Sequence, residues 1–198
     1  MPSSPSAPPE DTLLLCLDLQ PPFLAAITDG AEVLRRCEFA VAGARTLGLP
    51  VAFTEQVPEK LGSTAATVLA LAPGAPVWPK TTFSALADER LHAALLADRP
   101  VRHLLLAGIE TSICVFQTAL GAIAAGLEVT ILVDCVGARR SGDAQVCLEA
   151  LARHGAHLLP SETVLYSILH DTGHPCFREF TRLVKAHHAP ASRTGTAD

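Results

Sequence analysis

Residues 101–127 constrain the fold more than any other part of the chain. The short apolar run 103–107 stops at Gly108, which is typical of a parallel strand buried on both faces. Apolar residues then recur at helical spacing, so we expect a helix that begins near Ser112 as its N-cap and ends at Gly126. A buried strand that leads directly into a helix predicts a sheet of the α/β type.

Cys114 falls in the first turn of this expected helix. Unpaired backbone N–H groups and the positive end of the helix dipole favour a thiolate there, which makes this cysteine a candidate nucleophile at neutral pH. Cysteine is also among the residue types most often buried, so a structural role is the alternative interpretation.

The rest of the chain continues the alternation of strands and helices. Strands are expected at 13–19, 50–54, 128–136 and 157–159, an extended segment at 73–79, and helices at 32–47, 64–72, 84–97, 143–154, 162–169 and 175–186; residues 55–63 are expected to form a loop. This order predicts a three-layer α/β/α fold with a central, mostly parallel sheet of about six strands. We expect one domain at 12–187, with a disordered lead at 1–11 and a disordered tail at 188–198.

Charge and cysteine usage narrow the class of protein. A net charge of −5 without a Lys/Arg-rich run argues against nucleic-acid binding, and the apolar stretches are too short or too polar to cross a membrane. The six cysteines contain no C-x-x-C pair, which argues against a disulfide-exchange protein and for a reducing compartment. We therefore expect a cytoplasmic protein, with nuclear and mitochondrial locations left open.

Three reactive side chains fall at the carboxyl ends of expected strands, where doubly wound sheets gather their ligands. Asp18 ends the first strand, Lys80 ends the extended segment, and Cys114 follows the apolar strand at 103–107. Asp18 can accept the thiol proton, and Lys80 can balance the negative charges. The glycines match no nucleotide-binding fingerprint, so a nucleotide site is not expected.

Three separated motifs resemble the isochorismatase-like, or cysteine hydrolase, superfamily, which includes the nicotinamidases. They are Asp18-Leu-Gln20-Pro-Pro-Phe23, Lys80-Thr-Thr-Phe83-Ser84, and Gly108-Ile-Glu-Thr-Ser-Ile-Cys114-Val-Phe-Gln-Thr118. The resemblance covers residues 12–187. A nearer resemblance, through Thr54-Glu55-Gln56, Gly108-Ile109-Glu110 and His174-Pro175-x-Phe177, is to a subgroup of this family without an assigned substrate.

The resemblance implies roles for these residues. Asp18 transfers protons, Lys80 orients the site, and Cys114 is the nucleophile that forms a thioester-type intermediate. The oxyanion is held by the backbone N–H groups of Cys114 and Glu110, with a cis peptide between Ile109 and Glu110. Further residues expected to bind the substrate or oxyanion are Gln20, Phe23, Phe83 and Thr118.

The sequence departs from the pattern of the nicotinamidases at one place. Nicotinamidases have an Asp and paired histidines after the second strand, whereas this chain has Thr54-Glu55-Gln56 there. We therefore expect no metal and no other cofactor. In the family that the chain resembles, members that cleave the vinyl ether isochorismate do not depend on a thiol, so the presence of Cys114 implies hydrolysis of a C–N bond of a small amide or carbamoyl compound. We also expect a homo-oligomer. The alternative is a catalytically silent protein of the same fold that acts in protein–protein interaction.

Overall fold

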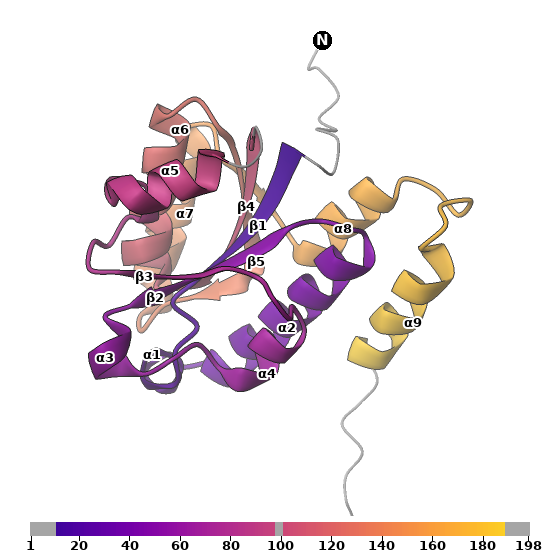
Figure 1. The fold of residues 1–198 in the computed structure, drawn as a ribbon, viewed down its shortest axis with the longest axis horizontal. Coiled ribbons are helices and arrows are strands. Elements are labelled where there is room, and N and C mark those ends of the chain that lie inside the picture. The colour runs from indigo at the N-terminus through magenta and orange to yellow at the C-terminus, as the bar shows by residue number, and fades with distance from the viewer. Residues whose placement is uncertain (1–10, 98–100, 189–198) are drawn as a thin grey trace, which may run out of the picture.

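The computed structural model describes residues 11–97 and 101–188 and contains one central sheet (Figure 1). The strands are β1 (Thr12–Leu17), β2 (Val51–Gln56), β3 (Val77–Lys80), β4 (His103–Ile109), β5 (Glu128–Gly137) and β6 (His157–Leu159). They pair in the order β3-β2-β1-β4-β5-β6, and every pairing is parallel. The predicted disordered lead and tail lie almost wholly outside the described residues.

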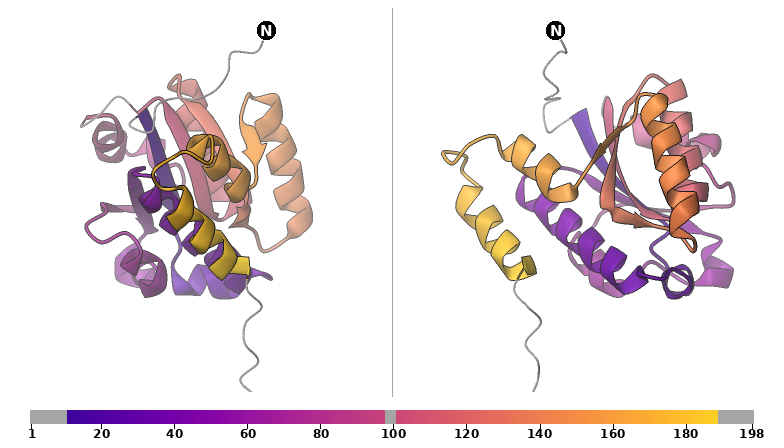
Figure 2. Two further views of the ribbon diagram at one scale, coloured as in Figure 1. Left: turned by 90° about the vertical axis from the view of Figure 1, so that its right-hand side faces the viewer. Right: turned by 180° about the vertical axis from the view of Figure 1, so that it is seen from behind.

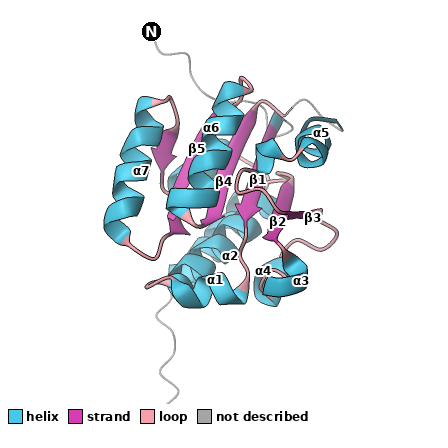
Figure 3. Ribbon diagram, turned by 90° about the vertical axis from the view of Figure 1, so that its left-hand side faces the viewer, coloured by secondary structure: helices cyan, strands magenta, loops and turns pink. Residues whose placement is uncertain are grey.

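Helices cover both faces of this sheet. They are α1 (Pro21–Ala26), α2 (Gly30–Thr46), α3 (Pro58–Leu61), α4 (Ala66–Ala70), α5 (Glu89–Ala97), α6 (Phe116–Ala124), α7 (Ser141–Arg153), α8 (Ser161–Leu169) and α9 (Phe177–His188). α2, α8 and α9 lie on one face (Figure 2), and α5, α6 and α7 lie on the other (Figure 3). The predicted three-layer fold is confirmed.

Side chains of β1 alternate between the two cores. Leu14 and Cys16 pack under α2, whereas Leu13, Leu15 and Leu17 pack on the opposite face. This is the pattern of a central parallel strand that is buried on both sides.

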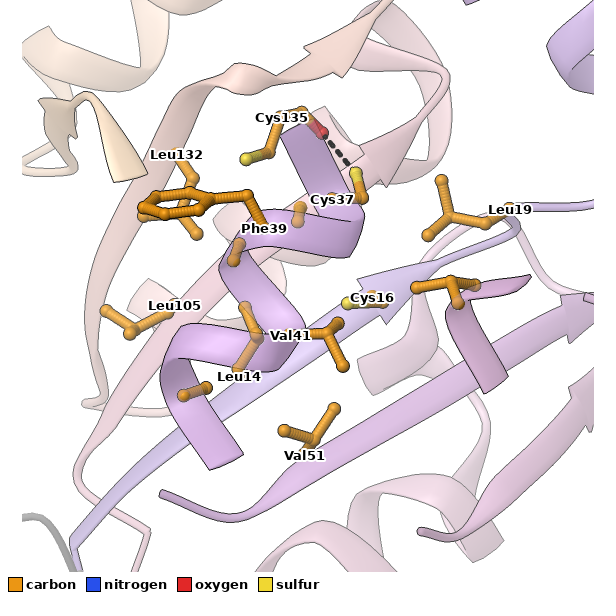
Figure 4. Close-up of a cluster of buried hydrophobic side chains, with 14 of the residues drawn as sticks. Leu14, Cys16, Leu19, Cys37, Phe39, Val41, Val51, Leu105, Leu132 and Cys135 are labelled. Atoms are coloured by element: carbon orange, nitrogen blue, oxygen red, sulfur yellow. Dashed lines mark hydrogen bonds between the residues drawn. The ribbon is translucent and has the colours of Figure 1, made fainter. Parts of the chain in front are cut away.

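Three of the cysteines are part of the core under α2 (Figure 4). Cys16, Cys37 and Cys135 are fully buried, and the Cys37 thiol donates to the Cys135 carbonyl oxygen at 3.2 Å. Burial raises the pKa of the Cys16 and Cys135 thiols. These side chains act as small apolar residues, and all six cysteines of the chain are free thiols.

Several predicted boundaries were wrong. Residues 21–26 form a helix, because proline fits the first turn of a helix, where its missing N–H is not needed. Glu55 and Gln56 belong to β2 and not to a loop, and Pro58–Leu61 is a short helix. Ser112 is not an N-cap: a π-helical turn begins at Thr111, one residue earlier, and continues into α6.

Within residues 11–97 and 101–188, no helix combines the length and apolarity needed to cross a bilayer.

Candidate active site

The carboxyl ends of β1, β3 and β4 bring Asp18, Lys80 and Cys114 together. Asp18 follows β1, Lys80 is the last residue of β3, and Cys114 lies in the π-helical turn after β4. Lys80 Nζ is 2.7 Å from Asp18 Oδ2 and 3.8 Å from Cys114 Sγ. The three side chains predicted to meet at this edge of the sheet therefore do so.

Asp18 and Lys80 form a buried ion pair. Their side chains are at most 1% exposed, and Thr54 Oγ1 donates to the second Asp18 oxygen, Oδ1, at 2.7 Å. A buried ion pair is tolerated only when its remaining polar atoms are also satisfied. Asp18 has a φ of 54°, a left-handed conformation that is uncommon outside glycine and that recurs at functional sites.

The Lys80 ammonium is fixed by a shell of acceptors. Besides Asp18 it donates to Gln56 Oε1 and to the Thr82 carbonyl oxygen, and Gln56 Nε2 in turn donates to the Thr81 carbonyl at 3.0 Å. These contacts join the end of β2 to the segment after β3. The ammonium is thereby held between the carboxylate and the sulfur.

Cys114 is 6% exposed. Burial is the largest cause that raises the pKa of this thiol, the negative charge of Asp18 is the second, and together they bring it to about 12 despite the Lys80 charge. The direction of this shift is opposite to the one expected from the place of Cys114 in the first turn of a helix, because that expectation took no account of burial beside a carboxylate.

Two groups besides Lys80 act on the pKa of the Cys114 thiol: the Asp18 carboxylate raises it, and the backbone of Glu110 lowers it. The peptide bond between Ile109 and Glu110 is cis, as predicted. The Glu110 side chain is bound by Arg139, whose Nε lies 3.0 Å from Oε2.

Two residues predicted to bind the substrate instead hold the scaffold. Gln20 is fully buried: its Nε2 donates to the carbonyl oxygens of Gln56 and Gly62, and its Oε1 accepts from Gln56 N–H. Thr118 is also fully buried, and its Oγ1 accepts from the Ala85 N–H at 3.0 Å. Gln20 thus joins the start of α1 to β2, and Thr118 joins α6 to the segment after β3.

The two predicted aromatic residues differ in exposure. Phe23 is half-buried on α1 and packs against the core under α2, whereas Phe83 is 55% exposed three residues after Lys80. Of these two residues, only Phe83 is more than half exposed.

Sequence reasoning missed Thr54 and Gln56 as members of this site. The segment Thr54-Glu55-Gln56 supports the family resemblance and lacks metal ligands, but neither feature indicates that its side chains contact Asp18 and Lys80. The available signal was strand order: β2 lies between β1 and β3, so its end must lie between Asp18 and Lys80. Within the described ranges no group of three or more His, Cys, Asp or Glu side chains is placed to hold a metal ion.

A six-stranded parallel sheet with a buried Asp-Lys-Cys cluster at its carboxyl edge defines a protein of the isochorismatase-like α/β fold. Residues 12–163 match the model of the isochorismatase domain, and the chain belongs to this family.

Two relatives illustrate the sequence similarity. Isochorismatase domain-containing protein 1 from Danio rerio is 39% identical over 177 residues, which are 89% of this chain. The chain spans only 62% of the length of that relative. Isochorismatase domain-containing protein 2A from Mus musculus is 33% identical over 177 residues, which cover 89% of this chain and 84% of the mouse protein.

Two solved structures share the fold. The MAR1 ribonuclease from Caenorhabditis elegans is 29% identical, with a TM-score of 0.85 over 97% of this chain and 98% of the nematode chain. The YcaC gene product from Escherichia coli, described as an octameric hydrolase of unknown specificity, is 21% identical, with a TM-score of 0.85 over 95% and 94% of the two chains.

Proposed function

We propose that this protein is a metal-independent cysteine hydrolase that cleaves a C–N bond of a small amide or carbamoyl compound. The observation that carries the proposal is the placement of Cys114: its sulfur lies 3.8 Å from the Lys80 ammonium, which is itself paired with the Asp18 carboxylate, and both Asp18 and the Glu110 backbone act on the thiol. A proton acceptor, a cation and an oxyanion donor are the groups that acyl transfer to sulfur requires.

In the first half-reaction the thiol proton moves to Asp18 as the sulfur attacks the carbonyl carbon. Burial and the Asp18 charge raise the pKa of Cys114, which favours a proton transfer that accompanies the attack. The carbonyl oxygen becomes an oxyanion at the N–H groups of Glu110 and Cys114. The C–N bond then breaks, and the leaving nitrogen takes the proton from Asp18.

In the second half-reaction water hydrolyses the thioester. Asp18 accepts a proton from the water, whose oxygen attacks the acyl carbon, and the C–S bond breaks. The sulfur regains a proton from Asp18, and the carboxylic acid leaves. Lys80 keeps the carboxylate and the sulfur in place through its contacts with Asp18, Gln56 and Thr82.

The test is hydrolysis of a panel of small amides and carbamoyl compounds, followed by amine release and by the mass of trapped Cys114 adducts. We expect turnover of at least one compound and an acyl adduct on Cys114, both lost in Cys114→Ala and retained in Cys147→Ala. Turnover that survives Cys114→Ala would refute the mechanism. Folded protein that turns over no compound would favour the catalytically silent alternative.

A second candidate function comes from the Caenorhabditis relative, which is named a ribonuclease. RNA cleavage would require contacts to phosphates, and the net charge of −5 disfavours them. We therefore expect a labelled single-stranded RNA to remain intact under conditions in which amides are hydrolysed. Cleavage that Lys80→Met abolishes would instead support the RNA substrate.

We also propose that the protein forms a homo-oligomer. The Escherichia coli protein of this fold is described as octameric. In this chain Phe83 is 55% and Val146 is 64% exposed, which leaves apolar surface that a second copy can cover.

A further inference from the structure

The Lys80 ammonium has more acceptors around it than protons to donate. Its Nζ lies 2.7 Å from Asp18 Oδ2, 3.2 Å from the Thr82 carbonyl oxygen and within hydrogen-bond distance of Gln56 Oε1. The sulfur of Cys114 is the fourth neighbour and the farthest, at 3.8 Å. An ammonium group has three N–H bonds, and sulfur is a weaker acceptor than oxygen. The three oxygens therefore take the three protons, and the sulfur has only the charge of Lys80 nearby.

The Gln56 amide has only one orientation that satisfies both of its neighbours. Its Oε1 accepts from the ammonium, which has no acceptor atom, and its Nε2 donates to the Thr81 carbonyl oxygen, which has no proton to give. Reversing the amide would place a donor against a donor and an acceptor against an acceptor. Gln56 is 6% exposed, and buried polar groups of this kind are held by their hydrogen bonds. The amide oxygen therefore stays turned towards Lys80.

The backbone of Gln56 is fixed by a second glutamine. Gln20 Oε1 accepts from the Gln56 N–H at 2.7 Å, and Gln20 Nε2 donates to the Gln56 carbonyl oxygen at 3.1 Å. Gln56 also lies directly opposite Lys80 in the parallel pairing of β2 with β3, so the two side chains leave the sheet on the same face. The backbone and the side chain of Gln56 thus both have a defined position relative to the ammonium.

We propose that Gln56 is a positioning residue that takes one Lys80 N–H and so keeps this bond directed away from the Cys114 sulfur. The effect of Gln56 on catalysis rests on the proposed hydrolase function. Without the Gln56 oxygen, the sulfur is the acceptor left for the third N–H among the four neighbours of the ammonium. An N–H bond that turns to the sulfur favours its negatively charged form. Gln56 therefore disfavours a thiolate before the substrate is bound.

Three substitutions of Gln56 separate this role from a packing role. Gln56→Met has nearly the same length but no acceptor oxygen. Gln56→Asn keeps the amide and is one methylene shorter, which withdraws the oxygen from Lys80. Gln56→Glu keeps the shape and the acceptor and adds a negative charge beside the thiol. The readout is the rate at which iodoacetamide alkylates Cys114 near neutral pH, measured by mass spectrometry on the full chain without any substrate.

We expect Cys114 to be alkylated about tenfold faster in Gln56→Met and Gln56→Asn than in the wild type, because a larger fraction of the sulfur is thiolate. Alkylation should be slower in Gln56→Glu, because a second carboxylate near the sulfur disfavours its charged form. Loosened packing would instead expose Cys114 and raise the rate in all three variants. A rate that rises in all three, or that does not change in Gln56→Met and Gln56→Asn, would overturn the proposal.

Turnover of an amide is the second readout. Gln56→Met should lower kcat by about 10²-fold, the cost of displacing a reacting group by about 1 Å, and leave KM nearly unchanged. Exposed Gln145→Met on α7 is the matched control and should change neither alkylation nor turnover.

Melting temperatures verify that each variant is folded, and Gln56→Asn keeps the test valid if Gln56→Met does not fold. If the protein hydrolyses no amide, the alkylation rates still decide whether Gln56 positions Lys80. If amides are hydrolysed but alkylation does not respond in opposite directions to Gln56→Met and Gln56→Glu, the positioning role is refuted and the hydrolase function stands.

Discussion

At the residue scale, the site combines a buried ion pair with a thiol whose pKa is raised. The Lys80 and Asp18 side chains are at most 1% exposed and Cys114 is 6% exposed, so Cys114 is the most accessible of the three residues. In the proposed mechanism the Asp18 charge has two opposing effects on Cys114. It raises the pKa of the thiol, and it supplies the acceptor for the thiol proton.

These two effects separate in Asp18→Asn. Burial still raises the pKa of Cys114, but the second cause, the Asp18 charge, is gone, so the pKa falls and alkylation by iodoacetamide near pH 8 becomes faster. Hydrolysis should fall by about 10²- to 10⁴-fold because the proton acceptor is lost. Mass spectrometry of Cys114 measures the first effect and amine release the second.

The pH dependence of the alkylation rate in the wild type is an independent check on the raised pKa of Cys114. With a pKa of about 12, wild-type Cys114 should react about tenfold faster per pH unit with no plateau below pH 10. Exposed Asp171→Asn is the control and should leave both rates unchanged. Slower alkylation of Cys114 in Asp18→Asn would show that the carboxylate promotes a resting thiolate.

Lys80→Met tests the ion pair itself. The variant leaves the Asp18 charge buried without a cation, so the free energy of unfolding should fall by about 3–5 kcal/mol in chemical denaturation. Adding Asp18→Asn should restore part of this loss, because no uncompensated charge then remains. Exposed Lys60→Met is the control. Additive losses in the double variant would argue against a direct interaction.

The sequence predicted which reactive residues converge but not how they are held. Asp18, Lys80 and Cys114 each lie at or shortly after the end of a strand or extended segment that the sequence predicts. The order of parallel strands is therefore enough to place the three residues together. The bonds of Gln20 and Thr118 to backbone groups depend on which way each side chain turns inside the fold. The raised pKa of Cys114 depends on burial, which helical position alone does not reveal.

At the element scale, β1 and β4 leave no room for a side chain at Gly108, beside the site. Gly108 has a φ of 110°, and a Cβ placed there would lie 2.0 Å from the Leu17 carbonyl oxygen. No side chain fits this contact without separating the two strands. These strands position Asp18 and the turn that contains Cys114, so their spacing sets the geometry of the site.

Gly108→Ala should therefore lower the free energy of unfolding by about 3 kcal/mol or more, from backbone clash and strain together. Denaturant unfolding measures this loss. Gly142→Ala is the matched control: a Cβ there meets no atom within 4 Å, and the residue lies in α7, so stability should rise slightly. A neutral Gly108→Ala would contradict the close approach of the strands.

Hydrophobic periodicity predicted the strands and long helices because their apolar positions repeat over many residues. It failed where local chemistry overrode the pattern. Pro21 and Pro22 begin α1, a helix that the apolar periodicity did not predict. Glu55 and Gln56 extend β2 because Glu55 accepts from the Thr64 N–H and Gln56 binds Lys80, so their polar atoms are satisfied.

At the scale of the whole molecule, α9 completes the layer over α2. Phe180 of α9 is fully buried and contacts Phe39 of α2 and Tyr166 of α8, with ring centroids 6.3 and 5.1 Å away. The apolar stripe of the last helix predicted that it would be buried, but not against which helix. Layer order follows from alternation along the chain, whereas partners within a layer depend on packing.

Association of copies is the remaining prediction at this scale. Among the residues that the structure describes, five large apolar ones are at least 37% exposed: Leu71, Phe83, Val146, Leu159 and Tyr166. Only 18% of the chain is charged, so little electrostatic repulsion opposes contact between copies. We expect light scattering at about ten micromolar to give a mass at least twice the 20.8 kDa of one chain.

Dilution and a surface substitution test whether the copies associate through these apolar side chains. The mass should fall towards one chain on dilution if the contact is weak, and Phe83→Ser should shift that fall to higher concentration, because it removes the most exposed aromatic ring among the described residues. Thr163→Ala, a change on α8 that alters no apolar surface of this size, is the control. A mass of one chain at every concentration would contradict the prediction. The five exposed apolar side chains would then be scattered surface residues, which are common on monomeric proteins.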